Sequence, residues 1–218
     1  VLTTTLTPQT KLLAHLPLFL HDNPKNALVV AFGMGTSFKS ALTHNIDVDA
    51  VELVPSVFKL FDMFHKDANE IMESGKGNVY INDGRNYVLL TDKRYDVIVV
   101  DPPPPINAAG TTVLYSQEFY EDCKNILNEN GIFVQWFWYG AREDDLKMLF
   151  ASFRNVFPNI LVAISPDGRG VFFIGSENNL SVDIKRISNR YIGKVYADLN
   201  EWNENDFSLE DITSLFVG

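Results

Sequence analysis

The sequence predicts an α/β fold, with a doubly wound, Rossmann-like sheet of about seven strands that ends in an antiparallel hairpin. Two observations carry this prediction. Short apolar runs rich in β-branched residues alternate with segments of helical spacing, which is typical of parallel strands joined by crossover helices. The run Val97-Ile98-Val99-Val100 is apolar throughout, which indicates a strand buried on both faces of the sheet.

The expected elements follow in chain order. Strands are expected at residues 27–32, 48–53, 78–81, 95–101, 132–136, 160–164 and 171–175. Helices are expected between them at 37–43, 55–71, 85–90, 116–127 and 143–156. Local signals mark three boundaries, because Pro55 suits a first helical turn, Ser116 suits an N-cap, and Gly131 suits the left-handed residue after a helix.

The end of the chain has a different character. Residues 165–170, between the last two strands, are rich in turn formers and too short for a crossover helix, which predicts an antiparallel hairpin at the sheet edge. Residues 183–197 have helical spacing, and Ser208 and Asp211 resemble a capping box. We therefore expect a Rossmann-like domain at residues 1–177 and a C-terminal helical appendage at 178–218.

Composition excludes several function classes. A net charge of −10 without any basic run argues against a nucleic-acid partner. No apolar run approaches the ~20 residues that cross a bilayer. The single Cys123, expected as a buried packing thiol, excludes an internal disulfide and fits a reducing, cytoplasmic location. The chain starts without Met, so we expect a piece of a longer protein.

The histidines show no spacing typical of metal ligands, and we expect no metal site. The sequence holds four of them, and His44 and His65 are interpreted as surface or helix-end residues.

A Gly-x-Gly turn, Gly33-Met34-Gly35, follows the first strand. Small residues let the backbone approach a ligand and leave helix N–H groups free to face it. Glu52 ends the next strand, about 20 residues farther on, where an acidic side chain can accept both hydroxyls of a ribose. Together the turn and Glu52 indicate a nucleoside site, although either feature alone is ordinary at a strand end.

Two more acidic residues follow the third and fourth strands. Asp83 can accept a hydrogen bond from an adenine amino group and Gly84 leaves room for the base, but Asp83 suits the N-cap of the next helix equally well. Asp101 precedes four prolines, which predict a stiff lip at the edge where open α/β sheets bind ligands. Because the first turn lacks the third glycine of a dinucleotide fingerprint, S-adenosylmethionine is favoured over NAD.

With the later segment LYSQEFY at residues 114–120, these features resemble the spermidine synthase (polyamine aminopropyltransferase) family, in particular a divergent bacterial branch often attached to membrane segments. The resemblance covers roughly residues 11–176. It implies a sheet of the class I methyltransferase type and a transferase of polyamine biosynthesis. It also implies decarboxylated S-adenosylmethionine or S-adenosylmethionine as co-substrate and a small-molecule amine as acceptor. Whether the protein forms a homodimer, and whether it belongs to a longer protein tethered to a membrane, are left undecided by the sequence.

The resemblance implies a role for each site residue. Glu52 would bind the ribose, Asp83 and Gly84 would hold the adenine, and the two glycines of the first turn would line the backbone near the sulfonium tail. Asp101 would help to deprotonate the attacking amine, which arrives as ammonium because the pKa of an alkylamine is ~10.

Three departures from the family pattern concern the amine. Met34 and Pro104 stand where the family has aspartates, and the tyrosine-bearing loop before the last strand is shortened to residues 165–168. The family's amino-terminal β-hairpin region is also not found. Each lost polar contact to a cation would cost on the order of 1–3 kcal/mol. The departures argue against ordinary putrescine as acceptor and leave a related transfer open.

Two other hypotheses remain. Asp101 and its first prolines also resemble motif four of amino-methyltransferases, and the chain could instead be a catalytically silent nucleoside-binding domain. Gln135, at the end of the fifth strand, could serve the site or satisfy a sheet edge. Four aromatic residues could contact a sulfonium or an amine, or simply pack in the core and rim: Tyr115, Trp136, Trp138 and Tyr139.

Overall fold

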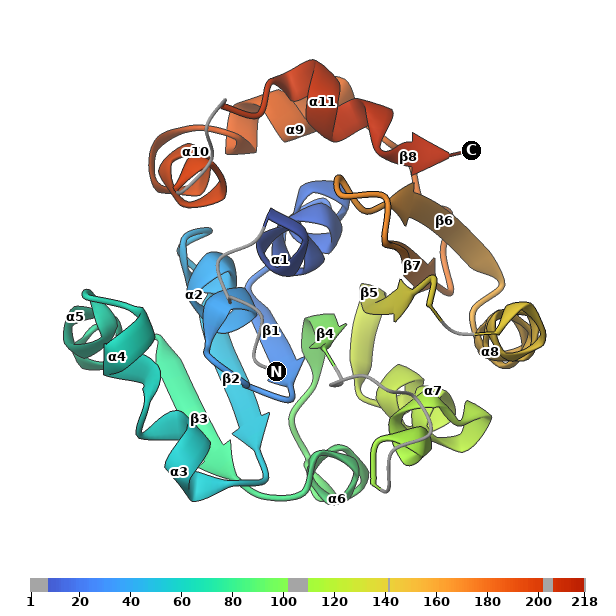
Figure 1. The fold of residues 1–218 in the computed structure, drawn as a ribbon, viewed down its shortest axis with the longest axis horizontal. Helices are drawn as coiled ribbons and strands as arrows, with labels where there is room; N and C mark the ends of the chain where they lie inside the picture. The colour runs from blue at the N-terminus through green and yellow to red at the C-terminus, as the bar shows by residue number, and fades with distance from the viewer. Residues whose placement is uncertain (1–7, 102–109, 141, 202–205, 218) are drawn as a thin grey trace.

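The computed structural model describes residues 8–101, 110–140, 142–201 and 206–217, and it shows helices on both faces of one sheet (Figure 1). Eight strands lie in the order β3-β2-β1-β4-β5-β7-β6-β8. The first five strands pair in parallel, whereas β7 pairs antiparallel with both β5 and β6. The predicted doubly wound sheet and its terminal hairpin are confirmed.

The strands span β1 Asn26–Val30, β2 Asp47–Glu52, β3 Gly77–Ile81, β4 Tyr95–Val100, β5 Leu127–Trp138, β6 Asn159–Ile164, β7 Gly170–Ser176 and β8 Phe216–Val217. The crossover helices include α2 Thr36–Leu42, α6 Gly84–Leu90, α7 Gln117–Asn125 and α8 Glu143–Val156. All seven expected strands are present. The two-residue strand β8 is an addition that pairs with β6, so the predicted hairpin lies one strand in from the sheet edge.

Alternate residues of each central strand face opposite helical layers. On β4, Val97 and Val99 belong to the core cluster formed with α1 and α2, whereas Ile98 and Val100 belong to the cluster formed with α6 to α8. All four side chains are fully buried. An apolar residue is therefore required at every position, which explains why the sequence of this strand shows no alternation.

Helix α1, Pro8–Leu20, was not predicted. It packs against α2, against α9 Ile184–Arg190 and against α10 Gly193–Asn200, and every residue from 11 to 20 is buried. A helix that is buried on all sides has no polar stripe, so its sequence lacks the 3.6-residue period that marks a surface helix.

Two local predictions were wrong. The segment expected as one helix over 55–71 forms α3 Pro55–Phe58, α4 Phe61–Phe64 and α5 Ala68–Glu73, because His65 takes an extended conformation between α4 and α5. Gly131 lies inside β5 and is no helix cap, while Asn130 takes the left-handed φ of 64°. Pro55 does occupy a first helical turn, and Ser116 does cap α7 through its bond from the Phe119 N–H.

The helices α9, α10 and α11 Leu209–Ser214 lie together over α1 (Figure 1). The capping box of Ser208 and Asp211 opens α11 as predicted. Cys123 is fully buried, also as predicted. The boundary between residues 177 and 178 stays a prediction. Within the ranges given above, no helix is long and apolar enough to cross a membrane.

Replacing Phe153 by Ala tests the core on the α8 side of the sheet. Phe153 is fully buried, and its ring lies 5.4 Å from that of Tyr120 and 5.6 Å from that of Phe173. We expect the free energy of unfolding in urea to fall by about 3–5 kcal/mol, because the lost burial is compounded by a cavity. Met148→Ala, on the exposed side of the same helix, should change it by less than about 0.5 kcal/mol. Equal losses would contradict the assigned packing.

Candidate functional site

The predicted glycine turn connects β1 to α2. Gly33 and Gly35 both take left-handed backbone conformations, with φ of 55° and 78°. A Cβ on Gly35 would overlap the ring of Phe61, so this position needs glycine for space as well as for conformation. A Cβ on Gly33 would meet nothing within 4 Å, so this position needs glycine for its φ alone and leaves the turn open on that side.

Glu52 ends β2 and is tied directly to this turn. Its carboxylate accepts hydrogen bonds from the Gly33 N–H at 3.1 Å and from the Val54 N–H at 2.9 Å. The side chain is only 8% exposed. Each oxygen keeps a second lone pair, so the carboxylate can still accept hydroxyl groups of a ligand. The structure therefore brings Glu52 and the glycine turn together, as predicted.

Asp83 caps α6, through a 2.9 Å bond from the Asn86 N–H to its Oδ1 atom. The capping role considered from the sequence is thus present. Recognition of a base would fall to the Oδ2 atom of the half-buried side chain. A Cβ on Gly84 would lie 2.7 Å from Val30 Cγ1, so glycine allows α6 to begin against the end of β1.

Asp101 follows β4, and its N–H donates to the Val30 carbonyl at 3.2 Å. Burial raises the pKa of its carboxyl to about 6, because desolvation disfavours the charged form. Val30 pairs in register with both Val51 and Val100, so the residues that follow β1, β2 and β4 lie at one edge of the sheet. The proline lip at residues 102–105 lies outside the described residues.

Tyr115 is within range of the charge of Asp101. It ends the short 3₁₀ helix η1 Thr112–Tyr115 and packs on Phe137, with ring centroids 5.7 Å apart. Burial and the charge of Asp101 raise the pKa of its phenol. Gln135 holds η1 in place, because its Nε2 donates to the Leu114 carbonyl at 3.1 Å. Gln135 Oε1 accepts from the Tyr120 hydroxyl at 2.7 Å, so this amide is satisfied within the protein.

The other three aromatic candidates lie in different surroundings. Trp136 packs with the cluster on the opposite face of the sheet from Tyr115. Trp138 and Tyr139 are 43% and 46% exposed at the end of β5. Of the four aromatic candidates, Tyr115 is the one whose phenol pKa responds to the charge of Asp101.

His65 is a support of the glycine turn that sequence reasoning missed. It follows α4, as a helix-end residue should, but it is 3% exposed and not on the surface. Burial and the nearby Lys39 charge lower the pKa of its imidazole. A neutral ring can donate its Nε2 proton to the Met34 carbonyl, 3.0 Å away. No sequence motif predicts this contact, because it joins two loops 31 residues apart.

Two of the cavities that described residues line have volumes of about 420 and 330 Å³, and neither lining includes Glu52, Asp83 or Asp101. The larger lies beside His44, at the opposite end of β1. In the ranges that the structure covers, no three His, Cys, Asp or Glu side chains are placed to hold a metal ion.

Comparison with known proteins places this site in a family. The spermine/spermidine synthase domain matches residues 7–165. A polyamine aminopropyltransferase of Caldicellulosiruptor saccharolyticus is 30% identical over 195 residues, which cover 83% of this chain and 69% of the relative. One of Methanocaldococcus jannaschii is 38% identical over 127 residues. That match covers 57% of this chain but only 43% of the relative, so the chain spans less than half of that protein.

Solved structures agree on the fold. A spermidine synthase in complex with the transition-state analogue AdoDATO superposes with a TM-score of 0.73 at 21% identity, over 95% of this chain and 71% of that one. Human methyltransferase-like protein 13 in complex with SAH gives 0.61 at 22% identity, over 91% of this chain and 92% of that one. Since the domain match takes in the glycine turn, Glu52, Asp83 and Asp101, the chain belongs to the spermine/spermidine synthase domain family.

Proposed function

We propose that this protein transfers an aminopropyl group from decarboxylated S-adenosylmethionine to a small-molecule amine, with Asp101 as the base. The observation that carries the proposal is the half-buried carboxyl at the end of β4, whose pKa is raised to about 6. A base with such a pKa is ionised at neutral pH and still binds a proton well enough to accept one. We also propose a cytoplasmic location; a homodimer stays a prediction.

The nucleoside would lie across the edge formed by the ends of β1, β2 and β3. Glu52 would accept the ribose hydroxyls, while its two bonds to backbone N–H groups hold the carboxylate still. Asp83 and Gly84 would receive the adenine, and Gly33 and Gly35 would lie along the sulfonium tail. Support comes from the register of these strands and from the domain match.

The chemical step needs a neutral amine. Asp101 would take a proton from the bound ammonium group, and the freed lone pair would attack the carbon next to the sulfonium sulfur. The new C–N bond forms as the C–S bond breaks, and its electron pair leaves with sulfur as methylthioadenosine. A carboxylate in hydrogen-bond reach both attracts the cation and orients its lone pair. Tyr115, which feels the charge of Asp101, would offer its ring to the same cation.

The acceptor amine is a separate part of the proposal. Met34 occupies the middle of the glycine turn, where the family resemblance implies an aspartate for the aminopropyl amine. An apolar side chain offers no hydrogen bond to a cation, so Met34 provides no acceptor for the aminopropyl amine of the co-substrate. From this departure together with Pro104 and the shortened loop at residues 165–168, we expect ordinary putrescine to be a poor acceptor. Pro104, the second departure, lies outside the described residues.

Calorimetry with three nucleosides tests the choice of co-substrate. We expect decarboxylated S-adenosylmethionine to bind about tenfold more tightly than S-adenosylmethionine, because the extra carboxylate of the latter would approach Asp101. Methylthioadenosine, the expected product, should bind as well. A preference for the carboxylated form would contradict aminopropyl transfer and favour amine methylation. If one of them binds but no transfer to an amine is seen, the chain is a catalytically silent nucleoside-binding domain. If none of the three binds, the nucleoside site itself is refuted.

Glu52→Gln tests the ribose contact. Loss of a charge-assisted acceptor should weaken methylthioadenosine binding by about 10- to 100-fold, the equivalent of roughly 1.5–3 kcal/mol. Glu70→Gln, an exposed change on α5, is the matched control and should leave the affinity unchanged. The unfolding temperature of both variants should be recorded, because Glu52 also binds the Gly33 N–H. Unaltered affinity in a folded Glu52→Gln protein would remove Glu52 from the site.

The pH dependence of turnover tests Asp101. The base form grows as pH rises through the pKa, so kcat/KM should increase up to about pH 6 and then level off. Asp101→Asn should lower kcat by at least about a hundredfold and leave nucleoside affinity nearly unchanged. Asp92→Asn, in the exposed loop before β4, is the control. Undiminished turnover in Asp101→Asn would refute the base assignment.

A further inference from the structure

A pocket lies at the amino-terminal end of the sheet, away from the candidate active site. The cavity of about 420 Å³ is lined by residues 23–25 before β1, by residues 43–46 between α2 and β2, and by Arg190, Ile192 and Val195. Gly33 and Asp101 follow the opposite ends of β1 and β4. The two sites are therefore separated by the length of β1.

The lining of this pocket is basic although the chain is acidic. The sequence has 28 acidic and 18 basic residues, yet no described residue of the lining is acidic, and three are Lys25, His44 and Arg190. The Arg190 guanidinium is held in place by bonds to the carbonyls of Leu18, His21 and Asp22. Neither Arg190 nor Lys25 makes an ion pair with a described residue. Asp22 acts on Arg190 through its charge, and the Asp96 carboxylate accepts from the Lys25 backbone N–H, but neither carboxylate lines the pocket. The charged side chains of the lining are therefore basic.

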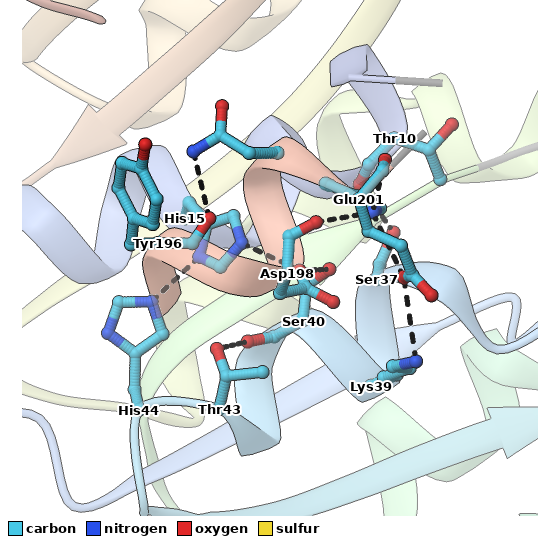
Figure 2. Close-up of polar contacts among 12 residues, drawn as sticks. Thr10, His15, Ser37, Lys39, Ser40, Thr43, His44, Tyr196, Asp198 and Glu201 are labelled. Carbon is cyan, nitrogen blue, oxygen red and sulfur yellow. Dashed lines mark hydrogen bonds and ion pairs between the residues drawn. The ribbon is translucent and has the colours of Figure 1, made fainter. Parts of the chain in front are cut away.

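A buried hydrogen-bonded chain leads from the pocket into the core (Figure 2). Asp198 Oδ2 lies 2.9 Å from His15 Nε2, and His15 Nδ1 lies 2.8 Å from His44 Nε2. Ser40 donates to the same Asp198 oxygen at 2.7 Å. His44 lines the pocket, and its second ring nitrogen points away from His15 (Figure 2). That nitrogen makes no hydrogen bond to any residue in the described ranges.

The hydrogen bonds among Asp198, His15 and His44 indicate which ring nitrogens carry protons. Although burial favours the protonated acid, the hydrogen bond and charge of His15 hold the pKa of Asp198 below its usual value. The carboxylate can only accept, so His15 Nε2 carries a proton. Burial, and then His15 and Arg190, hold the pKa of His44 well below the ordinary value. In a state where both rings are neutral, the geometry has His44 Nε2–H donate to His15 Nδ1, and His44 Nδ1 is then a bare acceptor.

One added proton reverses the donor and acceptor roles in the hydrogen bond between His15 and His44. A proton that binds His44 Nδ1 can be matched by transfer of the His44 Nε2 proton to His15 Nδ1, because these two nitrogens lie 2.8 Å apart and His15 Nε2 faces the Asp198 carboxylate. His15 Nδ1–H then donates to His44 Nε2. His44 now presents an N–H donor at the pocket, where the neutral pair presented a lone pair.

The other charged groups around the pair are largely balanced. Lys11 of α1 and Lys39 of α2 lie 3.3 and 3.6 Å from the Glu201 carboxylate, which follows α10. Asp198 is engaged with His15. Arg190 of α9 is left as the cation that opposes protonation of the pair. An anion in the pocket would both neutralise the charge of Arg190 and accept a hydrogen bond from His44 Nδ1–H.

We propose that this pocket binds a small organic oxyanion, a carboxylate or phosphate group on a compact apolar body, and that binding takes up one proton through His44, His15 and Asp198. Lys25 and Arg190 would neutralise the anion, and Ile46, Ile192 and Val195 would contact the apolar body. A bare oxyanion would leave most of the cavity unfilled. The proposal is independent of the aminopropyl-transfer hypothesis.

Nitrogen-edited NMR of the imidazole rings, at constant ionic strength, tests this proposal with sulfate, which stays a dianion across the range. With only four histidines, the signals can be assigned by substitution. Sulfate should shift His44 and His15 and convert His44 Nδ1 from an acceptor to a donor. Proton uptake on binding makes sulfate bind more tightly as the pH falls from about 8 to 6, by at most about tenfold for each pH unit. An unmoved His44 signal, or equal affinity at both ends of the range, would overturn the proposal.

Variants separate the site from general charge effects. His44→Gln should weaken sulfate binding and abolish its pH dependence. Lys25→Gln should weaken it several-fold, while Arg169→Gln, which removes an exposed cation on the β6–β7 turn, should not. Arg190→Gln removes hydrogen bonds that hold α9 to α1, and this variant could fail to fold. In that case Lys25→Gln alone tests the role of positive charge. An equal loss in Arg169→Gln would show non-specific attraction and refute the site.

Two carboxylates of equal charge test the apolar part of the ligand. Pentanoate should bind more tightly than acetate, because its chain can contact Ile46 and Ile192. Equal affinity would contradict an apolar body. Both titrations follow the same His44 signal, so they do not depend on any enzymatic activity.

Discussion

Parallel pairing of β1 with β2 and β4 is the constraint on which the candidate active site depends. The register places Val30 beside both Val51 and Val100, so whatever follows these three strands meets at one edge. The bond from the Gly33 N–H to Glu52 then joins the first two crossover turns into a single unit. A slip of one strand by one residue would turn its side chains to the other face and separate these groups.

Much of this architecture was predictable because its signals are local. The buried β4 run, the turn formers between β6 and β7, and the caps at Ser116 and Ser208 each lie in a few neighbouring residues. Glu52 and the glycine turn could be paired from spacing alone, since parallel strands align their carboxyl ends. Asp83 was harder, because the same carboxylate caps α6 and no sequence pattern separates capping from binding.

The remaining features depend on contacts between distant segments. Helix α1 carries no period because α2, α9, α10 and the sheet surround it. The Asp198–His15–His44 chain joins residues up to 183 positions apart, and no motif links them. His44 and His65 follow helix ends as expected, but the packing that buries His65 and half-buries His44 comes from other parts of the chain.

The short strand β8 has a consequence for the behaviour of the protein at high concentration. Its two residues occupy the outer side of β6 at Val162 and Ala163, and the Ile164 N–H donates to the Leu215 carbonyl. These backbone groups would otherwise form a ready template for a strand from a neighbouring molecule. The segment that follows α11 thus shields this stretch of β6 from intermolecular strand addition and aggregation.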